Sequence, residues 1–303
     1  MLAGLAVVVS VPWAFGYLLP QRGTWVLGIA ALSGYSPYPL FALLVLVWAL
    51  RQWAALLVCV LLLAAQAVTL APLYAGDGDP AAGRPRLRVM SVNLLFGGAD
   101  TAQVVRLVQQ HHIDVLALEE LSPGAVVGLE RAGLRALLPY AVNRAATGPQ
   151  GTGVWSRLPV NDVPVRQLRF NSCAVDIQVG GRVVRVRAVH PVPPIPASKW
   201  RRDLGILRAE LKDDVGVQTL ILGDLNASVH HRDLRHLMGG RWRDAAEADG
   251  AGLVRTWTPR LGTPSLLDLD HVLIDRGMTV ADWSTAVVRR SDHRAVIVDL
   301  AVR

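Results

Sequence analysis

The sequence predicts a mixed α/β domain that follows an N-terminal segment of apolar helices. Three observations support this prediction. Charged residues make up 18% of the 303 residues, yet residues 1–76 contain only Arg22 and Arg51 and no acidic residue. Beyond residue 76, short β-branched runs alternate with amphipathic helical patterns. Hairpin signals occur among the helical crossovers, which favours mixed sheets over a purely parallel one.

The apolar segment is long enough for about three membrane-spanning helices. A helix needs about 20 apolar residues to cross a bilayer, and the stretches 2–20 and 53–71 meet this requirement. Serine, glycine and proline interrupt the stretch between them, so its best span is 37–50, and residues 24–36 are expected to form an outer interfacial loop. Two helices are the alternative. A cleaved signal peptide is disfavoured because the basic start is missing and further apolar segments follow.

The charges that flank the spans decide the expected orientation. Arg51 lies in a tight turn between the last two spans and would prefer the cytoplasm. Three spans with this turn inside place the rest of the chain outside, although Arg22 argues for the opposite orientation. We therefore expect a multi-pass protein of the cell membrane with an extracytoplasmic domain.

The part after the apolar segment divides into a linker and one domain. Residues 77–86, rich in glycine, proline and charge, form the predicted linker, and the domain is expected over 87–303. Strands are predicted at 87–94, 114–119, 152–156, 173–179, 182–190, 218–223, 269–274 and 294–300. Helices are predicted at 101–112, 124–137, 198–213 and 231–238. Gly180-Gly181 predicts a hairpin turn, and Thr101 is expected to cap the first helix.

Composition excludes several classes of protein. Nearly all charge falls after residue 76, at a density typical of a globular domain, which excludes disorder and collagen-like repeats. Cys59 and Cys173 lie in different segments, so neither a disulfide framework nor a CxxC metal site is expected. The domain keeps a basic surplus that would suit an anionic substrate or a membrane surface. It has no dense basic run, so charge alone gives little support to nucleic-acid binding.

Polar side chains stand where the apolar strand runs end. They are Asn93 in MSVNLL, Glu119 and Glu120 in DVLALEEL, His190 in VRVRAVH, Asp224 and Asn226 in LILGDLNAS, Asp270 in LDLDHVLI, and Asp292 and His293 in SDHRAVIV. Carboxylate and amide oxygens suit Mg²⁺, which can neutralise charge on a phosphate and activate water. A His–Asp pair can act as acid or base. Each residue alone would more often be a turn, cap or packing residue, but together they predict hydrolysis of a phosphate ester.

In chain order, SVNLL, LALEEL, GTGVWSRLPV, AVH, ILGDLNAS, LDHVLI and SDHRAVIV resemble the endonuclease/exonuclease/phosphatase superfamily. The resemblance covers roughly 87–303. It implies a deoxyribonuclease I-like fold, a four-layer sandwich of two mixed β-sheets flanked by helices, with the site at one sheet edge. It also implies Mg²⁺ as the cofactor, with Mn²⁺ as a substitute.

The resemblance implies a role for each motif residue. Its metal site corresponds to Asn93, Glu120 and Asp292. Its catalytic set corresponds to His190, Asp224, Asn226, Asp270 and His293. In that set Asp224 orients the attacking water and Asn226 binds phosphate. His190 contacts phosphate, and either His190 or His293 protonates the leaving group. Asp270 is the partner of the final histidine, His293.

Four features depart from the family pattern or stay open. Glu119 stands where glutamine is more usual, and His271 stands where many members have tyrosine, with packing as its favoured role. The proline-rich loop after His190 carries nearby cations that could reach a phosphate or a lipid headgroup, or could start a solvated helix. These cations are Lys199, Arg201 and Arg202. Trp257 could lie beside a substrate or pack under a loop.

The expected function is a membrane-anchored, divalent-metal-dependent phosphoesterase, with nuclease-like hydrolysis of phosphodiesters preferred. Alternatives are a lipid-headgroup phosphodiesterase, a phosphomonoesterase and, more remotely, a non-catalytic binding module tethered to the membrane. The expected partners are a phosphate-ester substrate, either nucleic acid or a lipid headgroup, and the lipid bilayer.

Overall fold

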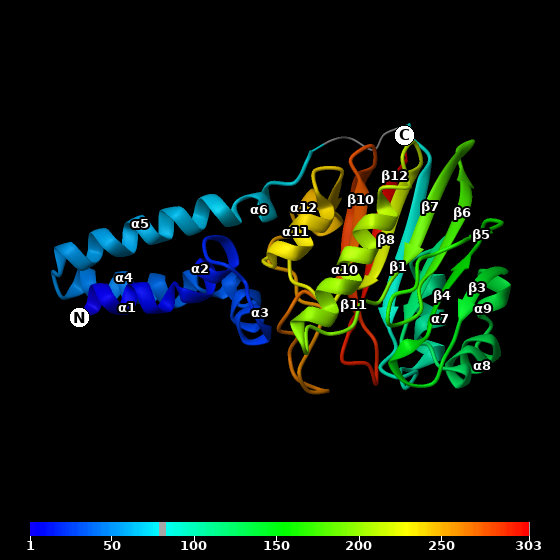
Figure 1. Cartoon of the computed structure of the whole chain (residues 1–303), viewed down its shortest axis with the longest axis horizontal. Helices are drawn as coiled ribbons and strands as arrows, with labels where there is room; N and C mark the ends of the chain where they lie inside the picture. Colours follow the sequence, from blue (N-terminus) through cyan, green and yellow to red (C-terminus); the bar gives the residue numbers. More distant parts are fainter. Residues whose placement is uncertain (79–82, 303) are drawn as a thin grey trace.

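A computed structural model describes residues 1–78 and 83–302. Residues 79–82 of the predicted linker 77–86 and the last residue of the predicted domain 87–303 lie outside the described residues. An arm of helices projects from a β-sandwich domain (Figure 1).

The domain contains two six-stranded mixed sheets, in the orders β11-β12-β1-β2-β4-β3 and β5-β6-β7-β8-β10-β9. The first sheet consists of β1 (Arg86–Asn93), β2 (Val115–Glu119), β3 (Tyr140–Arg144), β4 (Thr152–Ser156), β11 (Thr279–Val287) and β12 (Arg294–Ala301). The second consists of β5 (Asn161–Val163), β6 (Cys173–Val179), β7 (Arg182–Ala188), β8 (Gln218–Asp224), β9 (Trp242–Asp244) and β10 (Asp270–Asp275). β1 and β2 pair in parallel, as do β7 and β8, and the other pairs are antiparallel. The predicted mixed α/β class is confirmed.

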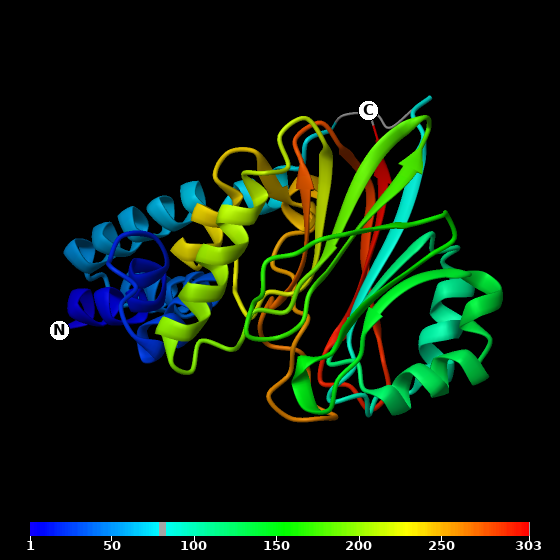
Figure 2. The ribbon, with the colours of Figure 1, turned by 45° about the vertical axis from the view of Figure 1, so that its right-hand side comes forward.

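Helices cover both outer faces of the paired sheets (Figure 2). Helices α7 (Thr101–Gln110), α8 (Pro123–Arg131) and α9 (Leu134–Leu137) pack on the first sheet. Helices α10 (Ala197–Leu211) and α11 (Arg232–Met238) pack on the second. Valine and leucine side chains from the inner faces of both sheets form the core between them, joined by alanines of α12 (Ala245–Asp249). A short turn, η2 (Gly148–Gln150), precedes β4. The resulting layers match the predicted four-layer sandwich.

The predicted strands all form, with ends shifted by at most two residues. Gly180 and Gly181 have φ of +57° and +81°, as a two-residue hairpin turn requires. Two helix predictions were wrong. Gly133, at φ +94°, breaks the predicted helix 124–137 into α8 and α9. The first helix is capped by Asp100, whose Oδ1 accepts the Gln103 N–H at 2.9 Å, and not by Thr101.

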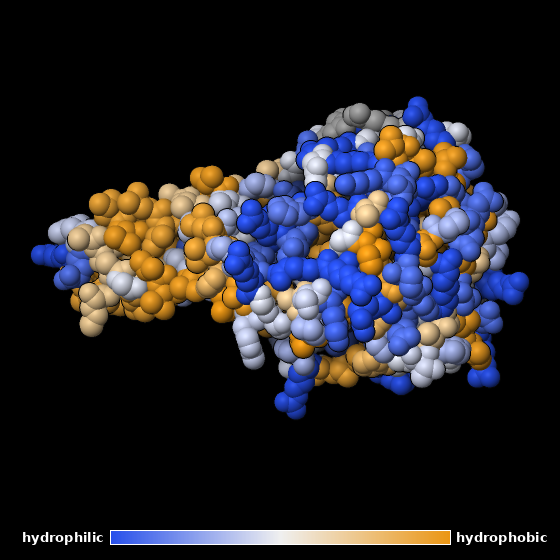
Figure 3. Space-filling model, in the orientation of Figure 1, coloured by the Kyte–Doolittle hydropathy of each residue, from blue (hydrophilic) through white to orange (hydrophobic). Residues whose placement is uncertain are grey.

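Residues 1–76 form a string of helices. They are α1 (Leu2–Val9), α2 (Val11–Tyr17), α3 (Thr24–Ala31), η1 (Ser33–Tyr35), α4 (Pro37–Ala49), α5 (Trp53–Leu70) and α6 (Pro72–Ala75). Helices α1, α4 and α5 pack together as the arm, whose surface is covered by hydrophobic residues while the visible face of the domain is mostly hydrophilic (Figure 3).

The three predicted spans are only partly supported by helix length. α5 is long and apolar enough to cross a membrane, and a second candidate is the pair Thr24–Tyr35 and Pro37–Ala49, which is bent by 58°. The predicted span 2–20 is divided at Ser10 into α1 and α2. Pro12 lacks the N–H for a continuous helix, and the Ser10 hydroxyl donates back to the Ala6 carbonyl at 2.9 Å. Helix length therefore supports one membrane span, or two if the bent pair forms a single span.

Helices α2 and α3 form a hairpin, residues 11–31, that docks on the domain. Leu27 of α3 is fully buried within the core beneath α10 and α11. Its backbone carbonyl accepts a hydrogen bond from His231 Nε2 at 2.9 Å. The Gln21 side chain donates to the His230 backbone carbonyl at 2.9 Å. The predicted interfacial loop over 24–36 is therefore wrong, because residues Thr24–Ala31 form a helix that packs into the domain.

Two buried histidines make this docking sensitive to acid. Burial lowers the pKa of His231 to about 4 and that of His230 to about 3. His230 Nδ1 lies 2.9 Å from the Tyr17 hydroxyl of α2. If the hairpin detached, His230 would lose its contact with Tyr17 and His231 its contact with Leu27, and both pKa values would rise toward the ordinary value of 6.5. The detached state therefore binds more protons than the docked state below pH 6.5. For each histidine, the free energy of docking weakens by up to about 1.4 kcal/mol for every pH unit as the pH falls toward 4.

We expect amide protection in Thr24–Ala31 to be constant above pH 6.5 and to decrease as the pH falls below it. Hydrogen–deuterium exchange, corrected for the intrinsic pH dependence of amide exchange, measures this. The matched control is His236→Gln, because His236 is exposed on α11 and its loss should leave the profile unchanged. Protection that stays flat down to pH 4 would contradict the assignment.

A buried ionic network fixes β7, the strand that leads to His190. Arg187 is buried, and its Nε and Nη2 each lie 2.7 Å from an oxygen of Asp214. Its Nη1 lies 2.5 Å from Glu210 of α10, and Arg185 also contacts Asp214 at 2.7 Å. Removing one partner from such a network leaves the other charges buried without compensation.

Arg187→Met should therefore lower the free energy of unfolding by about 3–5 kcal/mol. The control is Arg166→Met, because Arg166 and Asp213 form an ion pair at 2.8 Å in which both side chains are more than half exposed. Such surface pairs contribute about 0–1 kcal/mol. Denaturant unfolding of the full chain in detergent compares the two variants, and equal effects would contradict the network's role.

Candidate active site

The eight predicted site residues meet at one edge of the sandwich. Asn93 ends β1, Glu120 follows β2, Asp224 ends β8, and Asp270 begins β10 directly opposite Asp224 in the antiparallel register. Together they surround a cavity of about 450 Å³. Six of the eight line it: Glu120, His190, Asp224, Asn226, Asp292 and His293. Asn93 and Asp270 stand behind these, each hydrogen-bonded to a lining residue. The structure brings the set together, and the roles assigned to its members stay predictions.

Asp224 is the centre of the set. Its Oδ2 accepts a hydrogen bond from Asn93 Nδ2 at 3.0 Å and lies 3.5 Å from His190 Nε2 and 3.6 Å from His293 Nε2. Its Oδ1 accepts the Asn226 backbone N–H at 2.8 Å. Burial raises the pKa of Asp224, but His293, His190 and the Asn226 N–H more than offset this and lower it to about 2. Asp224 is therefore ionised at neutral pH.

The sequence GDLN requires its glycine for close backbone packing. Gly223 has φ +143°, and a Cβ there would lie 2.0 Å from the Val189 carbonyl oxygen. This contact brings β8 against the chain that leads into His190. Asn226 adopts φ +48°, and its Nδ2 donates to the Pro191 carbonyl at 3.0 Å. The motif thus ties the Asp224 loop to the His190 loop.

His293 forms a pair with Asp270. Its Nδ1 lies 2.8 Å and 3.0 Å from the two Asp270 oxygens. Burial lowers the pKa of His293, but Asp270 and Asp224 raise it more, to about 10. The ring is therefore an imidazolium whose Nε2 faces Asp224. Thr256, which sequence reasoning missed, holds Asp270 in place because its Oγ1 accepts the Asp270 N–H at 3.1 Å.

Glu120 and Asp292 are two carboxylates of the cavity lining that could hold a cation. Glu120 Oε2 accepts the Phe96 N–H at 2.7 Å, and Oε1 accepts from Asn93 at 3.3 Å. Asp292 Oδ2 accepts from Trp257 Nε1 at 3.1 Å. Its Oδ1 is buried and, within the described chain, has no hydrogen-bond partner. This oxygen lies 3.9 Å from His293 Nε2, and a buried carboxylate oxygen without a hydrogen bond, in a cavity that Glu120 also lines, fits a divalent cation with oxygen ligands.

Asn93 is placed to support this site. Its Nδ2 bridges Glu120 and Asp224, while its Oδ1 accepts the Leu95 N–H at 3.0 Å. It therefore orients the two carboxylates.

A second group of potential ligands is Asp224, Asp270 and His293, whose donor atoms lie within 4.8 Å of one another. His293 Nδ1 is engaged by Asp270, and its Nε2 faces Asp224.

The structure places the residues that sequence reasoning left open. Trp257 lines the cavity and holds Asp292. His271 is buried between Asp244, at 2.6 Å, and the Ala227 carbonyl, at 2.7 Å, and has the packing role that was favoured.

Glu119 lies fully buried beneath the site, where its carboxyl contacts the Ser91 hydroxyl at 3.2 Å. Burial, together with Asp270 and Asp224, raises the pKa of Glu119 well above its usual value. The shift favours the neutral form of the carboxyl, which is the form closest to the glutamine that is more usual at this place.

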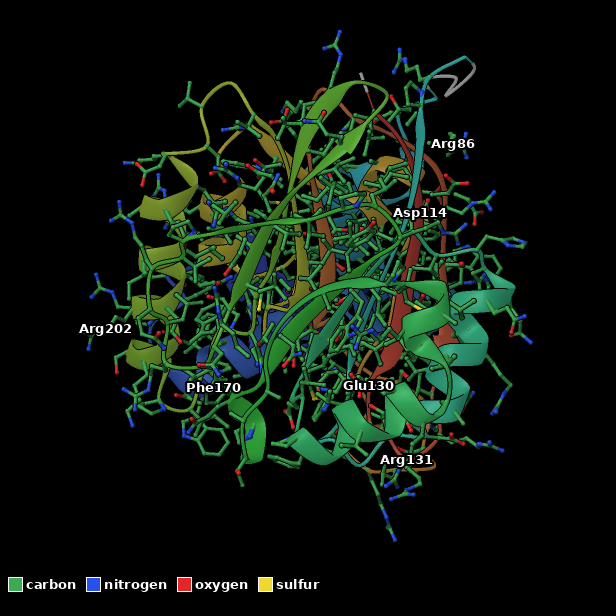
Figure 4. The ribbon with its side chains drawn as sticks, turned by 90° about the vertical axis from the view of Figure 1, so that its right-hand side faces the viewer. Arg86, Asp114, Glu130, Arg131, Phe170 and Arg202 are labelled. Atoms are coloured by element: carbon green, nitrogen blue, oxygen red, sulfur yellow. The ribbon has the colours of Figure 1, made fainter. Side chains whose placement is uncertain are left out.

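The cations after the proline-rich loop do not reach the cavity. Arg201 pairs with Asp233 at 3.0 Å, and Arg202 points outward from α10 (Figure 4). Within the part of the chain that the structure describes, no lysine or arginine lines the cavity.

Comparison with known proteins agrees with this geometry. The model of the Endonuclease/Exonuclease/phosphatase family matches residues 90–293. Similar solved structures include TDP2 from D. rerio with a single-strand DNA product (17% identity, TM-score 0.59, 72% of this chain and 99% of that chain). Others are sphingomyelinase C from Streptomyces griseocarneus (19%, 0.51, 72% and 100%) and the 3′ phosphatase NExo from Neisseria with a product DNA hairpin (19%, 0.57, 70% and 98%). These likenesses concern the fold. No curated protein gives a significant match.

Proposed function

The chain belongs to the endonuclease/exonuclease/phosphatase family, and we propose that it is a membrane-anchored, divalent-metal-dependent phosphodiesterase. The observation that carries the proposal is the arrangement around Asp224. An ionised carboxylate there faces the His293 imidazolium at 3.6 Å. The same cavity is lined by Asp292, whose Oδ1 accepts no hydrogen bond from the described residues.

Glu120 and Asp292 would hold the cation, with Mg²⁺ expected and Mn²⁺ as a substitute. When bound, the ion neutralises negative charge that develops on the phosphoryl group. Trp257 and Asn93 would act through these two carboxylates, because each donates a hydrogen bond to one of them.

The other residues support hydrolysis by direct attack of water. Asp224 would orient a water molecule and accept its proton as the new bond from oxygen to phosphorus forms. The ester P–O bond breaks, and His293 would donate its Nε2 proton to the departing oxygen. Asp270 keeps His293 charged and oriented. His190 and Asn226 line the cavity beside Asp224 and would donate hydrogen bonds to phosphoryl oxygens.

Nucleic acid and lipid headgroups are the two candidate classes of phosphodiester. Two of the similar structures contain DNA, and another is a sphingomyelinase C. Proteins that bind nucleic acid contact its phosphates with lysine and arginine. The residues described around this cavity include neither, and this observation favours the lipid candidate over the nuclease-like activity that the motifs suggest.

The proposed anchor is the arm of α1, α4 and α5. The 18 residues of α5 would span roughly 27 Å, and only 22% of them are buried. Soluble proteins rarely expose an apolar surface of this extent. The chain N-terminus and the α4–α5 turn, which contains Arg51, lie at the far end of the arm from the domain (Figure 1). Arginine favours the cytoplasmic side, so we propose that the domain is extracytoplasmic. A reporter enzyme that is active only outside the cytoplasm should therefore be active when it is fused to the C-terminus.

The activity is tested with the full chain in lipid nanodiscs, because α3 contributes to the domain core. We expect hydrolysis of bis(p-nitrophenyl) phosphate that requires Mg²⁺ or Mn²⁺ and stops when a chelator is added. The absence of both hydrolysis and cation binding would instead support a non-catalytic binding module.

A further inference from the structure

Helix α3 of the N-terminal segment forms one wall of the catalytic cavity. Leu27, Gly28 and Ala31 line the same cavity as Asp224 and His293, the residues proposed to be catalytic. The helix is held there by the buried Leu27 side chain and by the hydrogen bond from His231, which itself lines the cavity. The segment that is expected to enter the membrane therefore also shapes the active site.

The mouth of the cavity is apolar. Phe96 and Ile195 line it and are 58% and 77% exposed. Phe170 and the Pro193-Pro194 pair add further apolar surface to the lining. Together with α3, these residues would place an uncharged, water-repelling surface around any phosphate held by the catalytic set.

The outer side of α3 continues this apolar surface. Trp25 is 88% exposed, and Ile29 and Leu32 are also exposed. Helix α3 lies where the arm meets the domain (Figure 1), at the level that a membrane–water interface would occupy if the arm is inserted. Tryptophan is enriched at that level of a bilayer.

We infer that α3 is a specificity element that selects phosphodiesters carrying an apolar chain, with Gly28 leaving room for that chain beside the catalytic residues. This inference rests on the proposed function and concerns its substrate class, a membrane amphiphile whose phosphate enters the cavity while its chain lies against α3. Nucleic acid, which lacks such a chain and requires cations along its path, is the class that α3 would disfavour.

The inference is tested with alkyl p-nitrophenyl phosphates that share one leaving group and differ only in chain length. The full chain in nanodiscs is assayed with the methyl, butyl and octyl diesters and with a single-stranded oligonucleotide. Burial of each methylene is expected to raise kcat/KM by about fourfold until the cavity is filled. We therefore expect an octyl-to-methyl ratio of at least about 10-fold and much slower cleavage of the oligonucleotide.

Gly28→Phe tests whether α3 is responsible. A Cβ added at Gly28 would meet no atom within 4 Å, and its φ is not positive, so a side chain can begin there without strain and phenylalanine would occupy the proposed chain site. Circular dichroism verifies that the variant folds. The matched control is Gly4→Phe, because Gly4 is also a helical glycine with no atom within 4 Å of an added Cβ, but it lies in α1 of the arm. Gly28→Phe should lower the octyl-to-methyl ratio at least about 10-fold, and Gly4→Phe should leave it at the wild-type value. The control also accounts for partitioning of the octyl diester into the nanodisc.

Each outcome separates the inference from the function on which it rests. If no diester is hydrolysed, the proposed function fails. If the diesters are hydrolysed but kcat/KM does not depend on chain length, or if Gly28→Phe and Gly4→Phe give equal ratios, the function stands and the role of α3 is wrong. Cleavage of the oligonucleotide faster than the octyl diester would also overturn the inference, in favour of a nuclease.

Discussion

Replacing Asp224 by asparagine should lower kcat/KM for bis(p-nitrophenyl) phosphate by at least about 10³-fold. Asparagine has the same shape and can still accept the Asn226 N–H, which Asp224 holds at 2.8 Å. It cannot accept a proton from water, and it removes the negative charge that faces His190 and His293. The loss should therefore appear in turnover and not in folding, which circular dichroism and thermal unfolding can verify.

Asp268→Asn is the matched control for this variant. Asp268 is also a buried aspartate on the same side of the domain, but it accepts the Val229 N–H at 3.0 Å and does not line the catalytic cavity. Burial raises the pKa of Asp268 to about 6, so loss of its charge should cost less there than at Asp224, whose pKa is lowered to about 2. We expect activity within a few-fold of wild type. Comparable losses of activity in the two variants would mean that Asp224 only supports the folded structure and takes no part in the reaction.

The second large effect concerns the cation. Glu120→Gln should raise the Mg²⁺ concentration for half-maximal activity at least about 10–100-fold, the range found when the surroundings of a metal site are altered. The substitution removes the charge from one of the two carboxylates proposed to hold the ion, while the amide oxygen keeps the hydrogen bond from the Phe96 N–H. Activity should return in part as Mg²⁺ is raised, and this dependence separates weak metal binding from misfolding.

Glu130→Gln serves as the control for Glu120→Gln. Glu130 is exposed on α8, remote from the cavity lining (Figure 4), and its replacement should leave the Mg²⁺ dependence unchanged. An unaltered Mg²⁺ requirement in Glu120→Gln would remove Glu120 from the metal site.

The sequence predicts the central strands of both sheets well and their edge strands poorly. The strands that were missed, β3, β5, β9 and β11, are the four edge strands of the two sheets. An edge strand packs on fewer neighbours and faces solvent along one side, so it does not need a continuous apolar run. β3 has no fully buried residue, and β11 has one, Thr279. The central strands are buried on both faces, and their β-branched runs are visible in the sequence for that reason.

The site was predictable because its residues stand at the ends of those central strands. Asp224 and Asp270 become neighbours through the register of β8 and β10, and Asn93 joins them through β1. Partners in irregular loops were not predictable. Trp257 reaches Asp292 through isolated backbone bridges to Leu267 and His293, and no periodic pattern precedes such contacts.

The docking of helix α3 on the domain could not be predicted, because an apolar helix in an uncharged segment has the same composition whether it contacts lipid or protein. Only its tertiary contacts reveal the difference. Leu27 is buried in the domain core, and its carbonyl is paired with His231. Helix α3 is apolar, as both a membrane segment and the lining of this cavity can be. For that reason the composition of the sequence changes at residue 76, although residues from both sides of this boundary line the cavity.

Hydrolysis of methyl p-nitrophenyl phosphate by the full chain in ¹⁸O-labelled water tests the central claim most directly. Attack of water on phosphorus, with Asp224 as the proton acceptor, predicts one ¹⁸O atom in the methyl phosphate product and none in p-nitrophenol, with Mg²⁺ required and with the rate of incorporation lost in Asp224→Asn. Label in p-nitrophenol, or incorporation into methyl phosphate at an undiminished rate without a divalent cation or in Asp224→Asn, would contradict it.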